Sequence, residues 1–449
     1  MKVKTLMLAS AMFLIAGALA FANGQSEEAE VPEGPVQITW WHAMGGALGE
    51  KLDEIAAGFN AAQDEYEVVP VNKGSYAETM TAGIAAYRSG EQPHIMQVFE
   101  VGTGTMMAAR GAIMPVYELM EEYGESFDPE GYLSTVTGYY TDPDGNMLSM
   151  PFNSSTPVLY YNQDAFEEAG LDPDQPPRTW EEVEEASRRL MDAGVVKAGF
   201  STTWPSWIMV ENLSAWHDVP IGTMANGFEG LGTEFTFNNE LVVRHHAQLA
   251  EWHEEGIFRY GGRQSQANAL FSSGEVGMFL ESSAGYAGFV SSCDFAFNTG
   301  MLPYWPQAEG APQNSIIGGA SLWVMSGHSD AEYDGVARFL SYLSSPEVQA
   351  DWHQFTGYLP ITYEAYELTR SQGFYEENPG TETALLQMTL NSPTENSKGL
   401  RFGNFVQIRD IINDAQEAIF AGDVGAQAGL DEAVARGNAL LREFEAANN

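Results

Sequence analysis

The chain has 449 residues, of which 44% are hydrophobic and 12% aromatic, so it can bury large cores and we expect two or three domains. Its 62 acidic and 20 basic residues give a formal charge of −42, which excludes binding to nucleic acid and to anionic membranes. Lysine is depleted as well, and this favours adaptation to high salt over an ordinary acidic secreted protein. The one cysteine, Cys293, excludes a disulfide within the chain.

Residues 1–22 have the pattern of a secretory signal peptide. Lys2 and Lys4 precede an apolar run, Leu6–Leu19, that is short for a transmembrane helix, and small residues occupy the cleavage positions. Residues 23–33 are acidic and small, which predicts a flexible leader. No cysteine lies near the start, so we expect an exported protein without a lipid anchor.

The first hundred residues after the leader alternate between strands and helices. Strands are predicted at 36–41, 67–71 and 94–99, and helices at 48–59, 79–88, 106–109 and 116–123. This order predicts an α/β lobe with a largely parallel sheet. Tyr76 and Glu100 come just after two of these strands, at the ends where open α/β sheets place ligands. An acidic residue just after a strand is more often a solvent-exposed cap than a ligand-binding residue.

The stretch 151–162 joins a polar segment to a buried strand in the middle of the chain. Asn153–Thr156 is rich in hydroxyl groups and predicts a loop, while Val158–Tyr161 is a β-branched and aromatic run typical of a buried strand. Such a combination suits a crossing between two lobes next to a ligand. An ordinary loop before an ordinary strand is the simpler interpretation of the residue types alone.

The remaining two thirds of the chain mix helices and strands. Helices are predicted at 164–170, 179–194, 207–216, 241–255, 267–273, 336–343, 346–355, 408–420 and 430–444, and strands at 198–200, 276–280, 297–304 and 316–324. Arg409 falls in the first turn of the predicted helix 408–420, where the helix dipole disfavours a cation. A bound anion would explain it, but a salt bridge to one of the many carboxylates is the simpler explanation.

The sequence offers no recognisable catalytic or metal-binding motif. GxSxG, HExxH, Walker A and CxxC patterns are absent, and the eight histidines are scattered. His245 and His246 are adjacent, so on a helix their side chains point in different directions. Acidic pairs are too frequent for their spacing to identify a glycosidase dyad. The many aromatic residues could stack on a sugar or polyol, although most aromatic side chains belong to cores.

Several long segments resemble family 1 extracellular solute-binding proteins, receptors that feed ABC importers. The family signature is matched by Tyr161-Asn-Gln-Asp-Ala-Phe-Glu-Glu-Ala-Gly-Leu-Asp-Pro173 followed by Pro177-Arg-Thr-Trp-Glu-Glu182. Similar segments within the family also correspond to 41–44, 73–76, 97–102, 151–161, 316–324, 352–361 and 399–404. The resemblance covers nearly the whole chain after the signal peptide.

The resemblance implies an α/β, two-lobe, type II periplasmic-binding-protein fold, with a ligand cleft between lobes joined by a hinge. The first lobe would hold 34–152 and 303–347, and the second 153–302 and 348–449. The implied ligand is sn-glycerol-3-phosphate or glycerophosphocholine, delivered by a monomer to the permease of an ABC importer, with no catalysis and no cofactor. The alternatives are a sugar or polyol receptor of the same family, or a secreted glycoside or phosphodiester hydrolase.

The resemblance also carries ligand-binding positions onto eight residues. They are Tyr76, Glu100, Ser155, Trp204, Ser282, Gly319, Tyr358 and Arg409. Tyr76 and Glu100 would meet the glycerol hydroxyls, and Trp204 would pack on the glycerol carbons. Tyr358 and Arg409 would hold the phosphate, and Gly319 would offer a backbone N–H. Ser283 is an alternative to Ser282, because the Ala-Gly-Tyr that follows departs from the family's Gly-Ser-Leu.

The surface charge is a second departure from the family, whose members are much less acidic. A strongly negative exterior should slow the approach of an anionic ligand, unless the cleft is locally positive or the salt concentration is high.

Overall fold

The computed structural model describes residues 34–109 and 111–448, so the predicted signal peptide and leader lie outside the described residues. Residues 35–449 form one compact unit, and the predicted lobe boundaries within it stay a prediction. Among the described residues, no helix is both long enough and apolar enough to cross a membrane.

The first sheet is mixed and has six strands in the order β2-β1-β3-β10-β4, with β5 also paired to β10. Its strands are β1 (Val36–His42), β2 (Tyr66–Asn72), β3 (Ile95–Phe99), β4 (Ile113–Met114), β5 (Met150–Ser155) and β10 (Gly318–Met325). β1 runs parallel to β2 and β3, as the early alternation predicts. The prediction of a largely parallel sheet is wrong, because β10 arrives from far along the chain and pairs antiparallel with β3, β4 and β5.

The second sheet has four strands in the order β7-β8-β6-β9. They are β6 (Pro157–Asn162), β7 (Ala198–Thr202), β8 (Val276–Ser282) and β9 (Phe297–Gly300). β6 is antiparallel to both of its neighbours, whereas β7 and β8 are parallel. Every residue of β6 and β7 is buried, which explains their unbroken runs of apolar and small residues.

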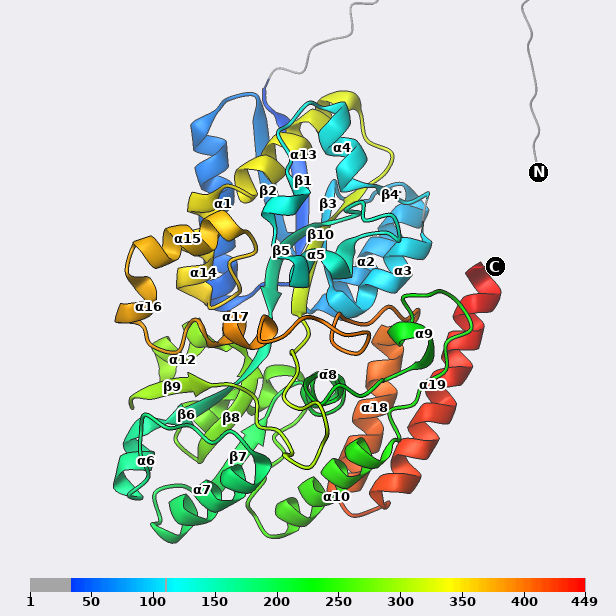
Figure 1. Cartoon of the computed structure of the whole chain (residues 1–449). Coiled ribbons are helices and arrows are strands. Elements are labelled where there is room, and N and C mark those ends of the chain that lie inside the picture. The colour runs from blue at the N-terminus through cyan, green and yellow to red at the C-terminus, as the bar shows by residue number, and fades with distance from the viewer. Residues whose placement is uncertain (1–33, 110, 449) are drawn as a thin grey trace, which may run out of the picture. The chain divides into compact units, whose positions relative to one another are not determined.

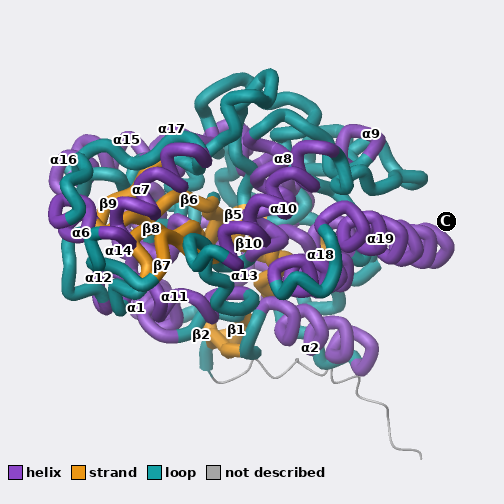
Figure 2. The backbone as a smooth tube through the Cα atoms, turned by 90° about the horizontal axis from the view of Figure 1, so that it is seen from below, coloured by secondary structure: helices purple, strands orange, loops and turns teal. Residues whose placement is uncertain are grey.

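Helices flank both sheets, and Figure 2 shows the strands β5 to β10 among them, with β1 and β2 at the lower edge of the view. Helices α1, α2 and α13 pack on β2, β3 and β1 respectively, and α7 packs on β7 (Figure 1). The helices are α1 (Gly46–Ala62), α2 (Tyr76–Ser89), α3 (Thr103–Ala108), α4 (Val116–Glu122), α5 (Ser134–Tyr140), α6 (Gln163–Glu168), α7 (Trp180–Asp192), α8 (Leu213–Trp216), α9 (Thr223–Asn226), α10 (Glu240–Glu254), α11 (Asn268–Ser272), α12 (Tyr286–Ser292), α13 (Asp330–Leu343), α14 (Pro346–Thr356), α15 (Tyr363–Ser371), α16 (Phe374–Glu377), α17 (Thr383–Met388), α18 (Phe405–Phe420) and α19 (Ala426–Asn448).

The chain passes directly from the first sheet into the second at Thr156. β5 ends at Ser155 and β6 begins at Pro157, so this one residue separates strands that belong to different sheets (Figure 1). The prediction of a polar loop at 153–156 is therefore wrong, because β10 supplies backbone partners that turn most of the segment into a strand. The Thr156 hydroxyl donates to the carbonyl of Ile316, 3.0 Å away, in the segment that leads into β10.

Two predicted helices near the candidate site differ from the observed ones. α18 begins at Phe405, so Arg409 is its fifth residue and lies beyond the first turn. The predicted helix 207–216 is in fact a π-helix, η3 (Trp207–Asn212), continued by α8. The hydrophobic period of 3.6 residues does not distinguish a single π-helical turn from an α-helix.

Candidate functional site

All eight residues that the sequence predicts for the ligand site line one cavity of about 280 Å³. Elements associated with the first sheet contribute Tyr76 at the start of α2, Glu100 after β3, Ser155 at the end of β5 and Gly319 in β10. The other four residues are Trp204 after β7, Ser282 at the end of β8, Tyr358 after α14 and Arg409 in α18. The structure thus brings the eight together, while their contact with a ligand stays a prediction.

Arg409 is held between two buried carboxylates. Its Nε and Nη2 donate to the two oxygens of Glu211, each at 2.7 Å, and Nη2 also donates to Glu100 Oε1 at 2.5 Å. Burial alone would lower the pKa of Arg409, but the two carboxylates outweigh it and raise the pKa, so the guanidinium stays charged. None of these three bonds uses Nη1. The salt-bridge explanation of this arginine is therefore confirmed.

The π-helix η3 explains how Glu211 reaches Arg409. A π-helical turn is wider than an α-helical turn. Trp207, the first residue of η3, lines the cavity, and Glu211, four residues later, accepts hydrogen bonds from Arg409. Just before η3, Trp204 has a φ of 41°, a left-handed conformation that is costly for a bulky residue. Strained backbone of this kind is commonly kept at ligand sites, where the surrounding structure enforces it.

Tyr76 is positioned by a buried chain of amides. Gln97 accepts from the backbone N–H of Ala43 and donates to Asn153 Oδ1, both at 2.8 Å, and Asn153 Nδ2 donates to the Tyr76 hydroxyl at 2.9 Å. The Tyr76 ring stacks on Phe99 with centroids 5.4 Å apart. These contacts fix both the ring and the hydroxyl of Tyr76 in the wall of the cavity.

Tyr358 lies close to Tyr76 and is equally constrained. Its ring stacks on Trp352 with centroids 5.6 Å apart. Burial is the main reason that the pKa values of Tyr76 and Tyr358 are raised, so both remain neutral hydroxyls that can donate to an anion.

Gly319 and Ser155 both line the cavity where β5 and β10 pair, with Ser154 opposite Gly319 and Ser155 opposite Gly318. Gly319 has a φ of 84°, and a Cβ there would collide with the carbonyl oxygen of Asn153. Only glycine lets the two backbones come this close. Between the two candidate serines, Ser282 lines the cavity, whereas Ser283 is buried behind it and borders a different, smaller pocket.

An acid that the sequence prediction missed also lines the cavity. Glu281 ends the buried part of β8 and is only 2% exposed, and burial raises the pKa of its carboxyl group to about 7. Glu211 was missed as well. Neither is among the eight positions that the resemblance carries over, and in a chain with 62 acidic residues no local pattern distinguishes them.

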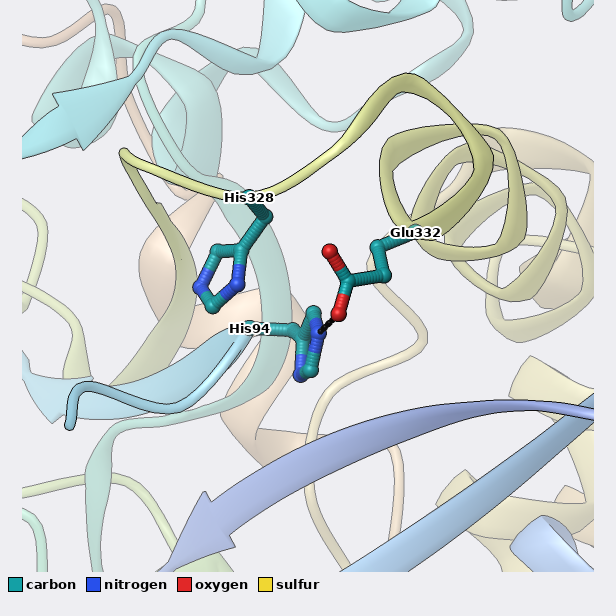
Figure 3. Close-up of side chains that lie close together, drawn as sticks. All are labelled: His94, His328 and Glu332. Atoms are coloured by element: carbon teal, nitrogen blue, oxygen red, sulfur yellow. Dashed lines mark ion pairs between the residues drawn. The ribbon is translucent and has the colours of Figure 1, made fainter. Parts of the chain in front are cut away.

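A cluster of potential metal ligands lies elsewhere, at His94, His328 and Glu332 (Figure 3). The backbone N–H of Thr39 donates to His94 Nδ1 at 2.9 Å, so neutral His94 carries its proton on Nε2, which faces Glu332 at 3.1 Å. Burial lowers the pKa of His94 and keeps it neutral. With Nε2 protonated, His94 has no lone pair for a metal, and the cluster serves to join β3 to α13.

A larger, mainly apolar cavity of about 890 Å³ is lined by residues of α2, α3 and α19, among them Ile84, Met107 and Phe444. Arg88, Arg401 and Glu445 also line it, but none of the eight predicted ligand-binding residues does.

Two α/β sheets that share one polar cavity and are joined by a direct strand-to-strand crossing define a receptor of the periplasmic-binding-protein type. Residues 54–383 match the sequence profile described as bacterial extracellular solute-binding protein, and the chain belongs to this family. Members of the family are receptors for small molecules, working with ABC importers, and are not enzymes.

Curated relatives are similar over almost the whole length. The chain is 50% identical over 406 residues to the sn-glycerol-3-phosphate-binding periplasmic protein UgpB of Rhizobium meliloti, covering 90% of this chain and 94% of the relative. It is 49% identical over 413 residues to the protein of the same name from Yersinia pseudotuberculosis, covering 92% and 94%.

Solved structures have the same fold at much lower identity. UgpB from Mycobacterium tuberculosis in complex with glycerophosphocholine has a TM-score of 0.75 at 20% identity, covering 92% of this chain and 99% of that one. Maltose-bound MalE3 from T. maritima has a TM-score of 0.73 at 16% identity, covering 90% and 100%. Because proteins with different ligands share it, the fold alone does not identify the ligand.

Proposed function

We propose that this protein is an exported receptor that captures sn-glycerol-3-phosphate or glycerophosphocholine and delivers it to the permease of an ABC importer. The observation that carries the proposal is the convergence of eight predicted ligand-binding residues on one cavity, in a chain about half identical to proteins named for glycerol-3-phosphate binding. The receptor acts without catalysis or cofactor, as a monomer released into the periplasm after removal of residues 1–22.

The groups around the cavity suit a phosphate ester of glycerol. Arg409 Nη1, the Tyr76 and Tyr358 hydroxyls and the Gly319 backbone can donate to phosphate or hydroxyl oxygens. Glu100 can accept from a glycerol hydroxyl, and Trp204 offers a flat apolar face to its carbons. A sugar or polyol receptor would be favoured if Arg409 pointed away from the cavity, but Arg409 lines it.

Calorimetric titration of the mature protein with sn-glycerol-3-phosphate, glycerophosphocholine and maltose tests the proposal. We expect binding in the micromolar range, about −8 kcal/mol, to at least one phosphate ester and no heat from maltose. Binding of maltose alone would support a sugar receptor and overturn the proposal. Release of glycerol phosphate from glycerophosphocholine by the purified protein would overturn the claim that it is not an enzyme.

A further inference from the structure

The carboxylate of Glu281 lies in the wall of the candidate site, and one of its two oxygens lacks a hydrogen-bond partner. Its Oε1 accepts from the backbone N–H of Ser282 at 2.7 Å. Its Oε2 is buried and has no hydrogen-bond partner among the described residues. The hydroxyl of Thr203 lies beside the carboxylate and, as a donor to it, partly offsets the rise in its pKa. The same hydroxyl is 3.2 Å from the carbonyl of Leu280, to which it can donate its single hydrogen instead. A buried, unpaired carboxylate oxygen is costly, so a ligand or a proton is expected to satisfy it.

No cationic side chain among the described residues that line the cavity is free to pair with Glu281. Among titratable groups, Tyr160 of β6 and Tyr358 after α14 lie beside Glu281, and Tyr286 of α12 lies near Tyr160. Glu100 after β3 and Arg409 of α18 line the same cavity, and Glu211 of η3 is bound to Arg409. Beside them, α11 contributes the neutral Asn268. Arg409 is the one cation among the described residues that line the cavity, and it is already bound to two carboxylates.

The net charge of the cavity determines the protonation state in which Glu281 can bind a phosphate. Glu100, Glu211 and Arg409 together carry a formal charge of −1 when all three are ionised. An ionised Glu281 would add a second negative charge directly beside an anionic ligand, and like charges in a buried site repel strongly. A protonated Glu281 removes that charge and offers an O–H donor in its place.

We propose that Glu281 is a further ligand-contacting, specificity-determining residue, which binds a phosphate ester as a carboxylic acid and donates a hydrogen bond from Oε2 to a phosphate oxygen. Capture of the ligand is then coupled to the uptake of a proton from solvent by this side chain. The inference rests on the proposed function, because it requires that the cavity hold a phosphate ester. A protonated Glu281 favours ligands that have no cationic group next to the phosphate.

The test is calorimetric titration with glycerophosphoglycerol, whose phosphodiester does not titrate near neutral pH. Measurements at pH 6, 7 and 8.5, in two buffers with different heats of ionisation, give both affinity and proton uptake. For the unmodified protein we expect affinity to fall by up to about tenfold per pH unit above pH 7, with uptake approaching one proton. In Glu281→Gln the side-chain amide keeps a donor, so binding should persist without pH dependence or proton uptake.

Glu275→Gln is the matched control, because it removes a surface carboxylate just before β8 that pairs with Arg259. It should titrate like the unmodified protein. Glycerophosphocholine, which carries a cation, is the second ligand. If its affinity rises with pH and Glu281→Gln weakens it selectively, Glu281 acts as a carboxylate facing the cation and the proposal is wrong.

Binding of glycerophosphoglycerol at pH 8.5 without proton uptake by the unmodified protein overturns the role of Glu281 alone. Absence of binding to every phosphate ester at every pH overturns the proposed function and this inference with it. The proton count comes from the unmodified protein, so a folding defect in the variant does not affect this outcome.

Discussion

At the residue scale, Arg409 is as much a structural residue as a ligand-binding one. It forms ion pairs with Glu100 and Glu211, both buried, and the loss of its side chain would leave both carboxylates without a cation. We predict that Arg409→Ala lowers the free energy of unfolding by about 3–5 kcal/mol, measured by urea denaturation. Loss of ligand binding in this variant is therefore interpretable only together with its stability.

Arg263→Ala is the control for that measurement. Arg263 also holds two acidic side chains, Asp414 and Glu417, but this group lies at the surface with Arg263 31% exposed. Its loss should cost about 1 kcal/mol or less. Equal losses in the two variants would show that burial of the Arg409 cluster has no energetic consequence.

Glu281 should make stability depend on pH. The pKa of its carboxyl group is about 7 in the folded protein, against about 4.3 in an unfolded chain. Between these values the folded state keeps a proton that the unfolded state has lost, so stability falls as the pH rises through this window and levels off above it. We predict that Glu281→Gln, without this loss, is more stable by about 3 kcal/mol at pH 8 and equally stable at pH 4.

Thermal or urea unfolding of the two proteins across pH 4–8 checks this difference, with Glu275→Gln as the surface control. A constant difference between Glu281→Gln and the unmodified protein at every pH would contradict a raised pKa at this position.

At the element scale, the pairing of β5 with β10 aligns the wall of the cavity. Gly319 needs both a positive φ and space for the Asn153 carbonyl, and alanine satisfies neither. We predict that Gly319→Ala costs more than about 2 kcal/mol and lowers the melting temperature. Gly373→Ala is the control, because Gly373 also has a positive φ, 77°, but no atom lies near its missing Cβ. It should cost only about 1 kcal/mol, and an equal loss would mean that the collision is relieved.

The elements that the sequence predicted well are those with strong local patterns. Mainly apolar runs located β3, β6 and β8, and amphipathic periodicity located α10, α18 and α19 to within a few residues. Pairing between distant segments was not predictable in this way. Asn153–Ser155 has the composition of a loop and becomes a strand only because β10 lies beside it, and β10 itself inserts antiparallel between strands that precede it.

The candidate site shows the same division between local pattern and distant contact. Tyr76, Glu100 and Arg409 could be placed because each lies in or beside a segment that resembles the family. The contact of Glu211 with Arg409 depends on a π-helical turn, and the interest of Glu281 depends on a carboxylate oxygen without a hydrogen-bond partner. Neither property is visible in the sequence. The sequence also did not show which carboxylates pair with Arg409. In the structure Arg409 lines the cavity while bound to Glu100 and Glu211.

At the scale of the whole molecule, the formal charge of −42 should oppose folding through self-repulsion. Salt screens this repulsion, with a Debye length of about 10 Å at 0.1 M and about 3 Å at 1 M. We predict that the melting temperature rises as sodium chloride increases from 0.05 to 1 M. A melting temperature that does not change, or falls, would contradict adaptation to high salt.

The same charge should control how fast a ligand arrives. The phosphate of sn-glycerol-3-phosphate carries about −1.5 to −2 at neutral pH, so the acidic surface repels it, whereas glycerophosphocholine is zwitterionic and has no net charge. We predict that the association rate constant for glycerol-3-phosphate, measured by stopped-flow tryptophan fluorescence, increases with salt, while that for glycerophosphocholine changes little. If the glycerol-3-phosphate rate falls with salt instead, the field at the cavity mouth is positive. Arg409 Nη1 would then outweigh the surrounding carboxylates in attracting the ligand.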